Sequence, residues 1–290
     1  MSNKDQIQRV LFEEVDVRGV LVGLETSYQE ALAKHGYPPL IERLLGELMA
    51  AAALLSANLK FEGKFILQAQ GDGDVTLLMA ECTEKHELRA IARFSENLPE
   101  EATLNQLLGN GRMALTIDPK QGQRYQGVVP LEGDNLAECL QAYFVQSEQL
   151  ATRLHLVADD TQAAGFLLQV LPSHDATSDD WNRIRHLATT LSDAELLTLD
   201  NETLLYRLYH EEACRLYDGE AVSFNCDCSR ERSLNSLKLL SKDELDEMLQ
   251  EQSRIEMACQ FCNEHYAFDQ ADIDYLYSGD TQAPSSGSVH

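Results

Sequence analysis

Apolar residues in the first third of the chain form one long continuous run and then shorter strand-like runs. Between residues 38 and 58, Leu and Ala dominate and helix breakers are few, which at this length predicts a buried helix. The turn sequence GDGD at residues 71–74 separates two of the runs that follow. These runs predict strands at residues 64–70, 75–81 and 86–94.

Strand-like runs and turn residues continue to residue 172. They predict strands at 112–117, 125–131, 152–157 and 165–171, and a helix at 135–148. Strands that are interspersed with a few helices and joined by short turns indicate an α+β fold, here an N-terminal domain over residues 1–172 with a largely antiparallel sheet. The apolar face of the predicted helix consists of Leu136, Leu140, Tyr143, Phe144 and Val145.

The pattern changes to amphipathic helices between residue 173 and about residue 219. Ser192 and Glu195 have the spacing of a capping box, which predicts a helix start at that point. This segment is too amphipathic for a disordered tether and too short for a domain. We therefore expect a helical linker that packs on another part of the molecule.

The last part of the chain predicts a small unit of its own. It begins at Cys226 and Cys228, continues with a polar helix at 230–240, and has a second capping box at Ser241 and Glu244. Residues 254–268 are typical of a strand, a C-x-x-C turn and a second strand. The polar residues 281–290 predict a disordered tail.

Charge and composition narrow the function classes. The net charge is −25, from 48 acidic and 23 basic residues, so nucleic acids and anionic membranes would be repelled. The first residues lack the apolar stretch of a signal peptide, and no run approaches the length needed to span a bilayer, so we expect a cytoplasmic protein. The glycines at 71–73 and 109–111 lack the setting of a nucleotide site and are interpreted as turn glycines.

Four of the seven cysteines form two close pairs, Cys226 with Cys228 and Cys259 with Cys262. Two such pairs can hold one metal ion with four thiolates or form two local disulfides. Cytosolic thiols are kept reduced, which favours a metal or redox site over a permanent disulfide, and a unit this small needs a staple such as zinc. The other three cysteines, Cys82, Cys139 and Cys214, are interpreted as buried apolar residues.

Several interpretations of the four cysteines stay open on residue chemistry alone. They could form a permanently folded zinc ribbon, a redox switch in which Arg230 and Arg232 favour the reactive thiolates, or a thiol-disulfide oxidoreductase. The oxidoreductase is disfavoured because Cys259 does not follow a buried strand and open a helix. His265 is a further candidate ligand, but four thiolates already complete a tetrahedral shell.

Motifs spread over the whole chain carry a family resemblance. They are FEEVDVRG (12–19), LQAQGDG (67–73), GNG (109–111), RYQGVVPLEGD (124–134), YFVQSEQL (143–150), LYRLYHEE (205–212) and CDCSRER (226–232). With them the chain resembles the bacterial redox-regulated heat-shock holdases of the thirty-three-kilodalton chaperonin family. Two departures, Ala151 where the family commonly has proline and Ser233 where some members have cysteine, leave the four cysteine positions untouched.

The resemblance implies an ATP-independent chaperone, not an enzyme, that binds unfolded client proteins and prevents their aggregation. It implies one zinc ion per chain on Cys226, Cys228, Cys259 and Cys262 in the reduced, inactive form. Oxidation would pair Cys226 with Cys228 and Cys259 with Cys262, release zinc and unfold the linker. The active form would be a homodimer that hands clients to ATP-dependent foldases. The main alternative is a constitutive zinc-stapled protein-interaction module.

The same resemblance, laid over the residue patterns, divides the chain into a core domain (1–172), a linker (173–225), a zinc-binding redox-switch domain (226–280) and a tail (281–290). Unfolding of the linker would release apolar side chains that otherwise cover the core domain. The positions expected to be released are Leu187, Leu191, Leu196, Leu204, Leu208 and Tyr209.

Overall fold

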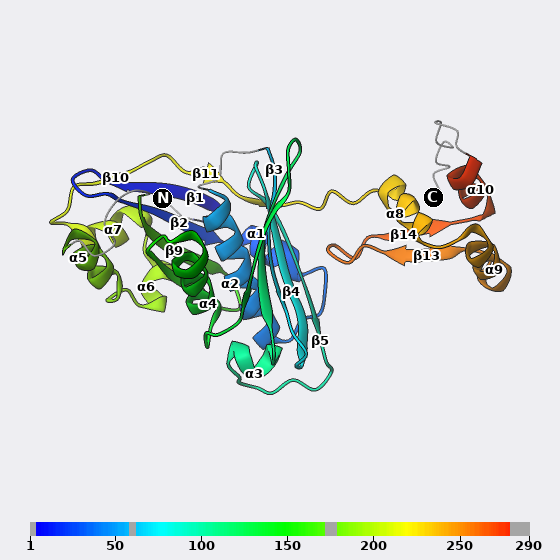
Figure 1. The fold of residues 1–290 in the computed structure, drawn as a ribbon, viewed down its shortest axis with the longest axis horizontal. Helices are drawn as coiled ribbons and strands as arrows, with labels where there is room; N and C mark the ends of the chain where they lie inside the picture. The colour runs from blue at the N-terminus through cyan, green and yellow to red at the C-terminus, as the bar shows by residue number, and fades with distance from the viewer. Residues whose placement is uncertain (1–3, 58–61, 172–178, 279–290) are drawn as a thin grey trace. The chain divides into compact units, whose positions relative to one another are not determined.

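The computed structural model describes residues 4–57, 62–171 and 179–278, and the chain divides into two compact units, Met1–Asn225 and Cys226–His290 (Figure 1). The first sheet of the first unit has the strand order β10-β1-β2-β9-β8, with β11 also pairing with β1, and all its pairs are antiparallel. Its strands are β1 (Gln6–Phe12), β2 (Val17–Leu24), β8 (Thr152–Ala158), β9 (Ala163–Val170), β10 (Cys214–Leu216) and β11 (Glu220–Ala221).

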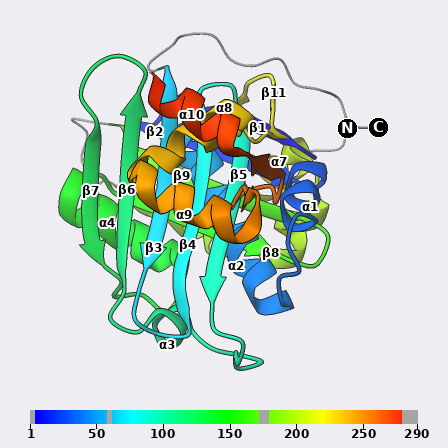
Figure 2. The ribbon, with the colours of Figure 1, turned by 90° about the vertical axis from the view of Figure 1, so that its right-hand side faces the viewer.

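The second sheet of the first unit has the order β12-β5-β4-β3-β6-β7, and its five long strands lie side by side in Figure 2. Only β12 runs parallel to its neighbour, β5, among the described pairs. The predicted α+β fold with a largely antiparallel sheet is therefore confirmed, although the strands form two sheets. They are β3 (Gly63–Gln70), β4 (Val75–Thr83), β5 (Glu87–Phe94), β6 (Arg112–Pro119), β7 (Tyr125–Pro130) and β12 (Ser223–Phe224).

Helix α2 (Pro39–Ser56) packs between the two sheets, with contacts to β4 and β5 of one and to β8 and β9 of the other. Its Ala-rich middle is fully buried, as predicted for residues 38–58. Gly46 allows the close approach to β8, because a Cβ there would lie 2.6 Å from the Cβ of Ala158. Helix α1 (Thr26–Leu32) precedes α2 and buries Tyr28 against it.

The predicted helix at 135–148 is two elements, α4 (Leu136–Tyr143) and a π-helical turn, Phe144–Glu148. A π turn adds a residue per turn and so rotates the following side chains away from the α-helical face. Val145 is consequently 59% exposed, so its predicted place on the apolar face was wrong. Helix α3 (Leu104–Leu108) has its own capping box, in which Thr103 and Gln106 bond reciprocally.

The glycine turns at 71–73 and 109–111 dock on each other. The Asp72 carboxylate accepts hydrogen bonds from the backbone N–H and the side-chain amide of Asn110, at 2.8 and 3.0 Å. A Cβ on Gly71 would lie 1.8 Å from the carbonyl oxygen of Leu108, so only glycine fits there. These contacts support the interpretation of the glycines as turn residues.

Three linker helices cover the face of the first sheet that points away from α2. They are α5 (Asp179–Ala188), α6 (Asp193–Thr198) and α7 (Asn201–Tyr209), and the predicted capping box at Ser192 and Glu195 is present. Tyr209 packs edge-on against Phe12 of β1 at 4.9 Å between ring centroids and donates a hydrogen bond to the carbonyl of Ile184. Strand β9 is buried at every residue because helices cover both of its faces.

The last part of the predicted linker, from residue 214, is extended, although the pattern predicted helices to about residue 219. Strands β10 and β11 pair with β1, and β12 pairs with β5, so residues 214–224 complete the edges of both sheets. Unpaired backbone groups at a sheet edge attract a short extended segment even where its sequence lacks a strand pattern. Residues 173–178 of the predicted linker lie outside the described residues.

The second unit has a core of eight buried side chains, fewer than either core cluster of the first unit. Its predicted strand-turn-strand segment and Ser241 capping box are present, and the predicted tail at 281–290 lies outside the described residues. None of the helices in the described ranges is long and apolar enough to cross a bilayer. The elements are α8 (Arg230–Ser236), a 3-10 turn (Leu237–Leu239), α9 (Lys242–Gln252), β13 (Ile255–Ala258), β14 (His265–Phe268) and α10 (Gln270–Ser278).

A carboxyl group between α2 and α6 should make the stability of the first unit depend on pH. Burial of Glu47, together with the nearby negative charge of Asp193, raises the pKa of Glu47 to about 7. The folded state then holds a proton that the unfolded chain releases near pH 4.5, so stability falls as the pH rises from about 4.5 to about 7. The fall is up to about 3 kcal/mol, and less to the extent that water reaches the half-buried group.

Glu47→Gln should remove this fall and raise the free energy of unfolding of the first unit at pH 8 by about 1 to 3 kcal/mol. Urea unfolding of both proteins at a series of pH values measures the difference. Glu30→Gln, at an exposed position on the neighbouring helix α1, is the matched control and should change little. A constant difference between Glu47→Gln and the parent from pH 4 to pH 8 would contradict the assignment.

Candidate metal centre

The four paired cysteines converge on one point of the second unit. Cys226 and Cys228 lie in the segment that leads into α8, while Cys259 and Cys262 lie in the turn between β13 and β14. The four Sγ atoms all lie within 4.8 Å of one another. Two close contacts between sulfur atoms join one pair to the other, with 3.7 Å from Cys226 to Cys259 and 3.3 Å from Cys228 to Cys262.

Local backbone geometry directs the thiols of the C-x-x-C turn toward the other pair. The backbone N–H of Cys259 donates to the carbonyl of Glu264 at 2.9 Å, and that of Asn263 donates to the carbonyl of Cys259 at 2.8 Å. Asn263 has a φ of 56°, in the left-handed region that asparagine tolerates better than most residues. On the other side, Ser229 caps α8 by accepting from the N–H of Arg232 at 3.2 Å.

The thiol spacing fits a tetrahedral metal ion. A zinc ion with Zn–S bonds of about 2.3 Å places its sulfur ligands about 3.8 Å apart. The observed 3.7 and 3.3 Å lie near this value, and four thiolates are a donor set that zinc prefers. His265 is exposed on β14, and the cluster found among the described residues contains the four cysteines alone.

Hydrogen bonds distinguish the individual thiols. Burial raises the pKa of Cys259, but the backbone N–H groups of Cys262 and Phe261 outweigh it, so its net pKa is lowered. Burial and the neighbouring sulfur atoms raise the pKa of Cys262. The Tyr266 hydroxyl donates to the sulfur of Cys228 at 3.2 Å, and this contact raises the pKa of Tyr266. Tyr266 could not be predicted from the sequence, because a tyrosine on a short strand gives no signal of such a contact.

The two arginines after Cys228 are engaged with aspartates. Arg230 bonds Asp272 at 2.6 Å and lies over the Phe268 ring at 5.0 Å, while Arg232 bonds the Asp227 carboxylate at 2.6 Å. Burial of Asp272 raises its pKa. The hydrogen bond from Arg230 and the other hydrogen bonds lower the pKa by more, so the net pKa is lowered. These pairs fasten α8 to α10 and to the cysteine segment, while the expected effect of the arginines on the thiolates stays a prediction.

The three remaining cysteines lie in the first unit. Cys82 and Cys139 are buried, as predicted, and burial raises the pKa of Cys82 to about 12. Cys214 is only partly buried on β10, so its interpretation as a buried apolar residue was wrong; the short edge strand leaves one side of it open. Burial still raises its pKa, to about 11.

Comparison with known proteins gives a consistent result over nearly the whole chain. The family described as Hsp33 protein matches residues 5–269. A 33 kDa chaperonin of Pseudomonas fluorescens strain SBW25 is 49% identical over 286 residues, covering 96% of this chain and 95% of the relative. One from Shewanella loihica strain PV-4 is 48% identical over 281 residues, covering 97% of this chain and 98% of the relative.

The fold is also that of a solved structure. The crystal structure of the 33 kDa chaperonin of Thermotoga maritima matches with a TM-score of 0.82, covering 94% of this chain and 97% of that one. Its sequence is 24% identical, so this likeness concerns the fold alone. With the profile match and the relatives near 50% identity, the chain belongs to the Hsp33 protein family.

Proposed function

We propose that this protein is a redox-regulated, ATP-independent holdase chaperone of the cytoplasm, which binds unfolding proteins and prevents their aggregation. The observation that carries the proposal is the cluster of four thiols at tetrahedral spacing, in a unit whose described residues form an apolar core of eight side chains. Membership in a family whose relatives are named chaperonins supports the chaperone activity. Such a holdase acts stoichiometrically and needs no catalytic site.

In the resting state, Cys226, Cys228, Cys259 and Cys262 would hold one zinc ion per chain. Zinc would supply a cross-link between the α8 segment and the β13–β14 turn, which the small apolar core cannot replace. The Arg230–Asp272 pair joins the same segment to α10 but is partly open to water, so it contributes little by itself. The fold of residues 226–280 would therefore depend on the four thiolates staying reduced.

Oxidation would close two local disulfides, Cys226 with Cys228 and Cys259 with Cys262. In each pair one thiolate attacks a peroxide oxygen and becomes a sulfenic acid as hydroxide leaves. The partner thiolate then attacks that sulfur, forms the S–S bond and expels a second hydroxide. Each pair thus gives two electrons to one peroxide. The thiolate ligands that connected the α8 segment to the β13–β14 turn through the metal are then lost.

Unfolding of the second unit would release the linker from the first sheet. We place this linker at residues 173–225, between the core domain (1–172) and the redox-switch domain (226–280). The linker helices bury Trp181, Leu191, Leu204, Leu208 and Tyr209 against the first sheet. Their release would expose both these side chains and the sheet face beneath them, an apolar surface suited to unfolded clients. The active form would be a homodimer that passes clients to ATP-dependent foldases.

Peroxide with mild heat should release one zinc ion per chain and convert the protein into a form that suppresses aggregation of a denaturing client. A chromogenic chelator measures the zinc, light scattering measures aggregation, and emission of Trp181, which is 4% exposed, should shift to the red. Peptide mapping should find each disulfide within its pair. Disulfides from Cys226 to Cys259 and from Cys228 to Cys262, the contacts seen here, would keep the unit stapled and contradict the switch.

The control is the reduced protein treated identically without oxidant. If it protects the client equally well, the redox part of the proposal fails and a constitutive zinc-stapled interaction module explains the cysteines better. Under that alternative, replacing Cys226 and Cys228 with serine abolishes client binding. Under the switch, the same replacement gives activity that no longer needs oxidant.

A further inference from the structure

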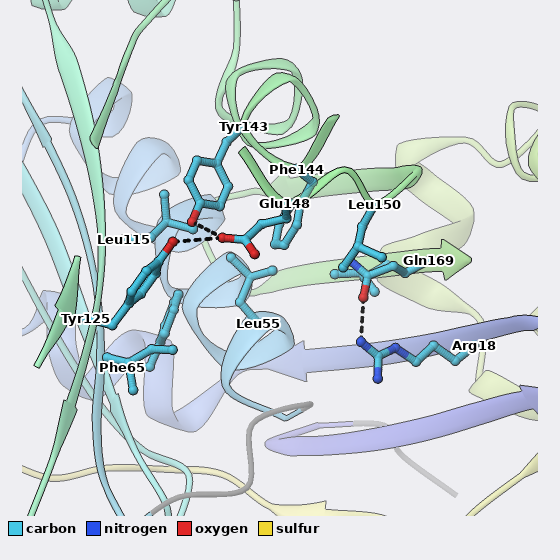
Figure 3. A pocket seen from close by; sticks show the side chains of 12 residues that line it. Arg18, Leu55, Phe65, Leu115, Tyr125, Tyr143, Phe144, Glu148, Leu150 and Gln169 are labelled. Carbon is cyan, nitrogen blue, oxygen red and sulfur yellow. Dashed lines mark hydrogen bonds between the residues drawn. The ribbon is translucent and has the colours of Figure 1, made fainter. Parts of the chain in front are cut away.

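A cavity of about 200 Å³ lies between the two sheets of the first unit (Figure 3). Its lining residues are remote in the sequence from the four paired cysteines of the second unit. Its walls are contributed by both sheets, by the end of α2, and by α4 with the π turn that follows it. Most of the wall is apolar, and polar groups gather at two places. The apolar lining residues include Leu55, Phe65, Leu115, Phe144, Leu150 and Leu167.

One polar place is the guanidinium of Arg18. Arg18 lies on β2 directly opposite Gln169 of β9, and its Nη2 donates to the Gln169 side-chain oxygen at 2.6 Å. Gln169 is itself held by donating to Thr152 at 2.9 Å. The Nε of Arg18 is buried and has no hydrogen-bond partner among the described residues, and no ion pair to this guanidinium is found there. Burial also lowers the pKa of Arg18, because its positive charge is only partly solvated.

The other polar place is the carboxylate of Glu148. It accepts hydrogen bonds from the hydroxyls of Tyr143 and Tyr125, at 2.6 and 3.1 Å. The π turn ends at Gln149, whose φ of 54° reverses the chain and leaves Glu148 directed back toward the tyrosines (Figure 3). Glu148 is therefore satisfied by its neighbours, whereas Arg18 is not.

We propose that this cavity binds a monocarboxylate that carries one apolar group about the size of an aromatic ring. The Arg18 guanidinium lines the cavity, is only partly buried and has no carboxylate partner among the described residues. It is therefore complementary to a carboxylate that enters from the cavity. The size follows from the volume, since a cavity of about 150 Å³ in another protein holds benzene. Glu148 disfavours a second negative charge. The same chemistry is offered by a free aromatic acid and by the C-terminal residue of a polypeptide.

The test uses the full-length reduced zinc protein and the ¹⁵Nε–¹Hε signal of Arg18, assigned by its loss in Arg18→Gln. Titration with 3-phenylpropionate should shift this signal with a dissociation constant on the order of 1 mM. The neutral 3-phenylpropanol should bind about tenfold more weakly or worse, because it lacks the charge-assisted bond. Phenylsuccinate, with two carboxylates, should also bind more weakly.

Two variants separate binding from folding, with ligand-observed NMR as the readout. Arg18→Gln should bind acid and alcohol equally, while Arg112→Gln, at an exposed position on β6, should bind like the parent. Leu150→Trp places a ring at the partly exposed wall and should block both ligands. Equal affinity for acid and alcohol in the parent protein overturns the proposal, as does a signal of Arg18 that does not move.

A peptide pair identifies the source of the carboxylate. A short glycine-serine peptide ending in phenylalanine is compared as free acid and as amide. Binding of the free-acid peptide, with the amide at least about tenfold weaker, assigns the cavity to polypeptide C-termini. Binding of 3-phenylpropionate but not of this peptide assigns it to free acids. Failure of both acids overturns the proposal and leaves the holdase function untouched, since no cavity residue belongs to the cysteine unit.

Discussion

Chelating zinc from the reduced protein should unfold residues 226–278 and leave the two sheets of the first unit folded. Structural zinc supplies about 10 to 16 kcal/mol of apparent binding free energy in small zinc-dependent units. The described part of the second unit has an apolar core of eight side chains, and its ion pairs, such as Arg230–Asp272 and Lys242–Asp246, are partly exposed. These contacts do not offset the entropy of ordering the chain, so we expect no stable fold without metal. Hydrogen exchange read by mass spectrometry measures the loss of protection in this region.

Two controls make the result specific. Added zinc should restore protection, and peptides from β2 to β9 in the same sample should keep theirs. Cys259→Ser should behave like the chelated parent, whereas Cys214→Ser, on β10 in the first unit, should keep both zinc and protection. If residues 226–278 stay protected after all zinc is removed, the metal does not support the fold of this unit.

Leu204→Ala should give a protein that suppresses client aggregation without any oxidant. Leu204 is fully buried on α7 in the cluster between the linker helices and the first sheet. Truncation of a buried leucine costs about 2 to 5 kcal/mol, through lost burial and the cavity left behind. The substitution weakens the packing of the linker helices on the first sheet, so these helices should detach while zinc stays bound. Light scattering with a denaturing client measures activity, and a red shift of Trp181 emission reports detachment.

Tyr206→Ala is the matched control because the same helix leaves Tyr206 73% exposed. It should stay inactive when reduced and keep the parent's emission. If Leu204→Ala detaches the linker but stays inactive, the covered sheet face is not the client surface. If the variant is active with Trp181 still buried, clients bind elsewhere.

Sequence periodicity predicted the elements that are long and buried in a regular pattern. The α2 run of Leu and Ala has the length of a helix and few breakers, and the turn sequence GDGD at 71–74 separates β3 from β4. No strand was predicted before residue 38, although β1 and β2 lie inside the first sheet. Strand β2 is buried on both faces, so it lacks the alternation that marks a half-exposed strand.

The shortest strands could not be predicted because partners far away in the sequence determine them. Strands β10 to β12 have two or three residues each, and only the edges of β1 and β5 make them extended. The sequence did bring the four cysteines together as one candidate site. It could not show that close sulfur contacts join Cys226 to Cys259 and Cys228 to Cys262, since these residues lie more than thirty positions apart.

The cover that β10 and β11 place over β1 has a consequence for synthesis on the ribosome. Phe12 pairs with Cys214, so the backbone groups at this edge of β1 stay unpaired until a segment about two hundred residues later has been synthesised. At about 5 to 20 residues per second, that wait is about 10 to 40 s. During this time the nascent chain presents an open strand edge, the kind of surface on which neighbouring chains can pair. A protein of a chaperone family is thus itself exposed to aggregation while it is being made.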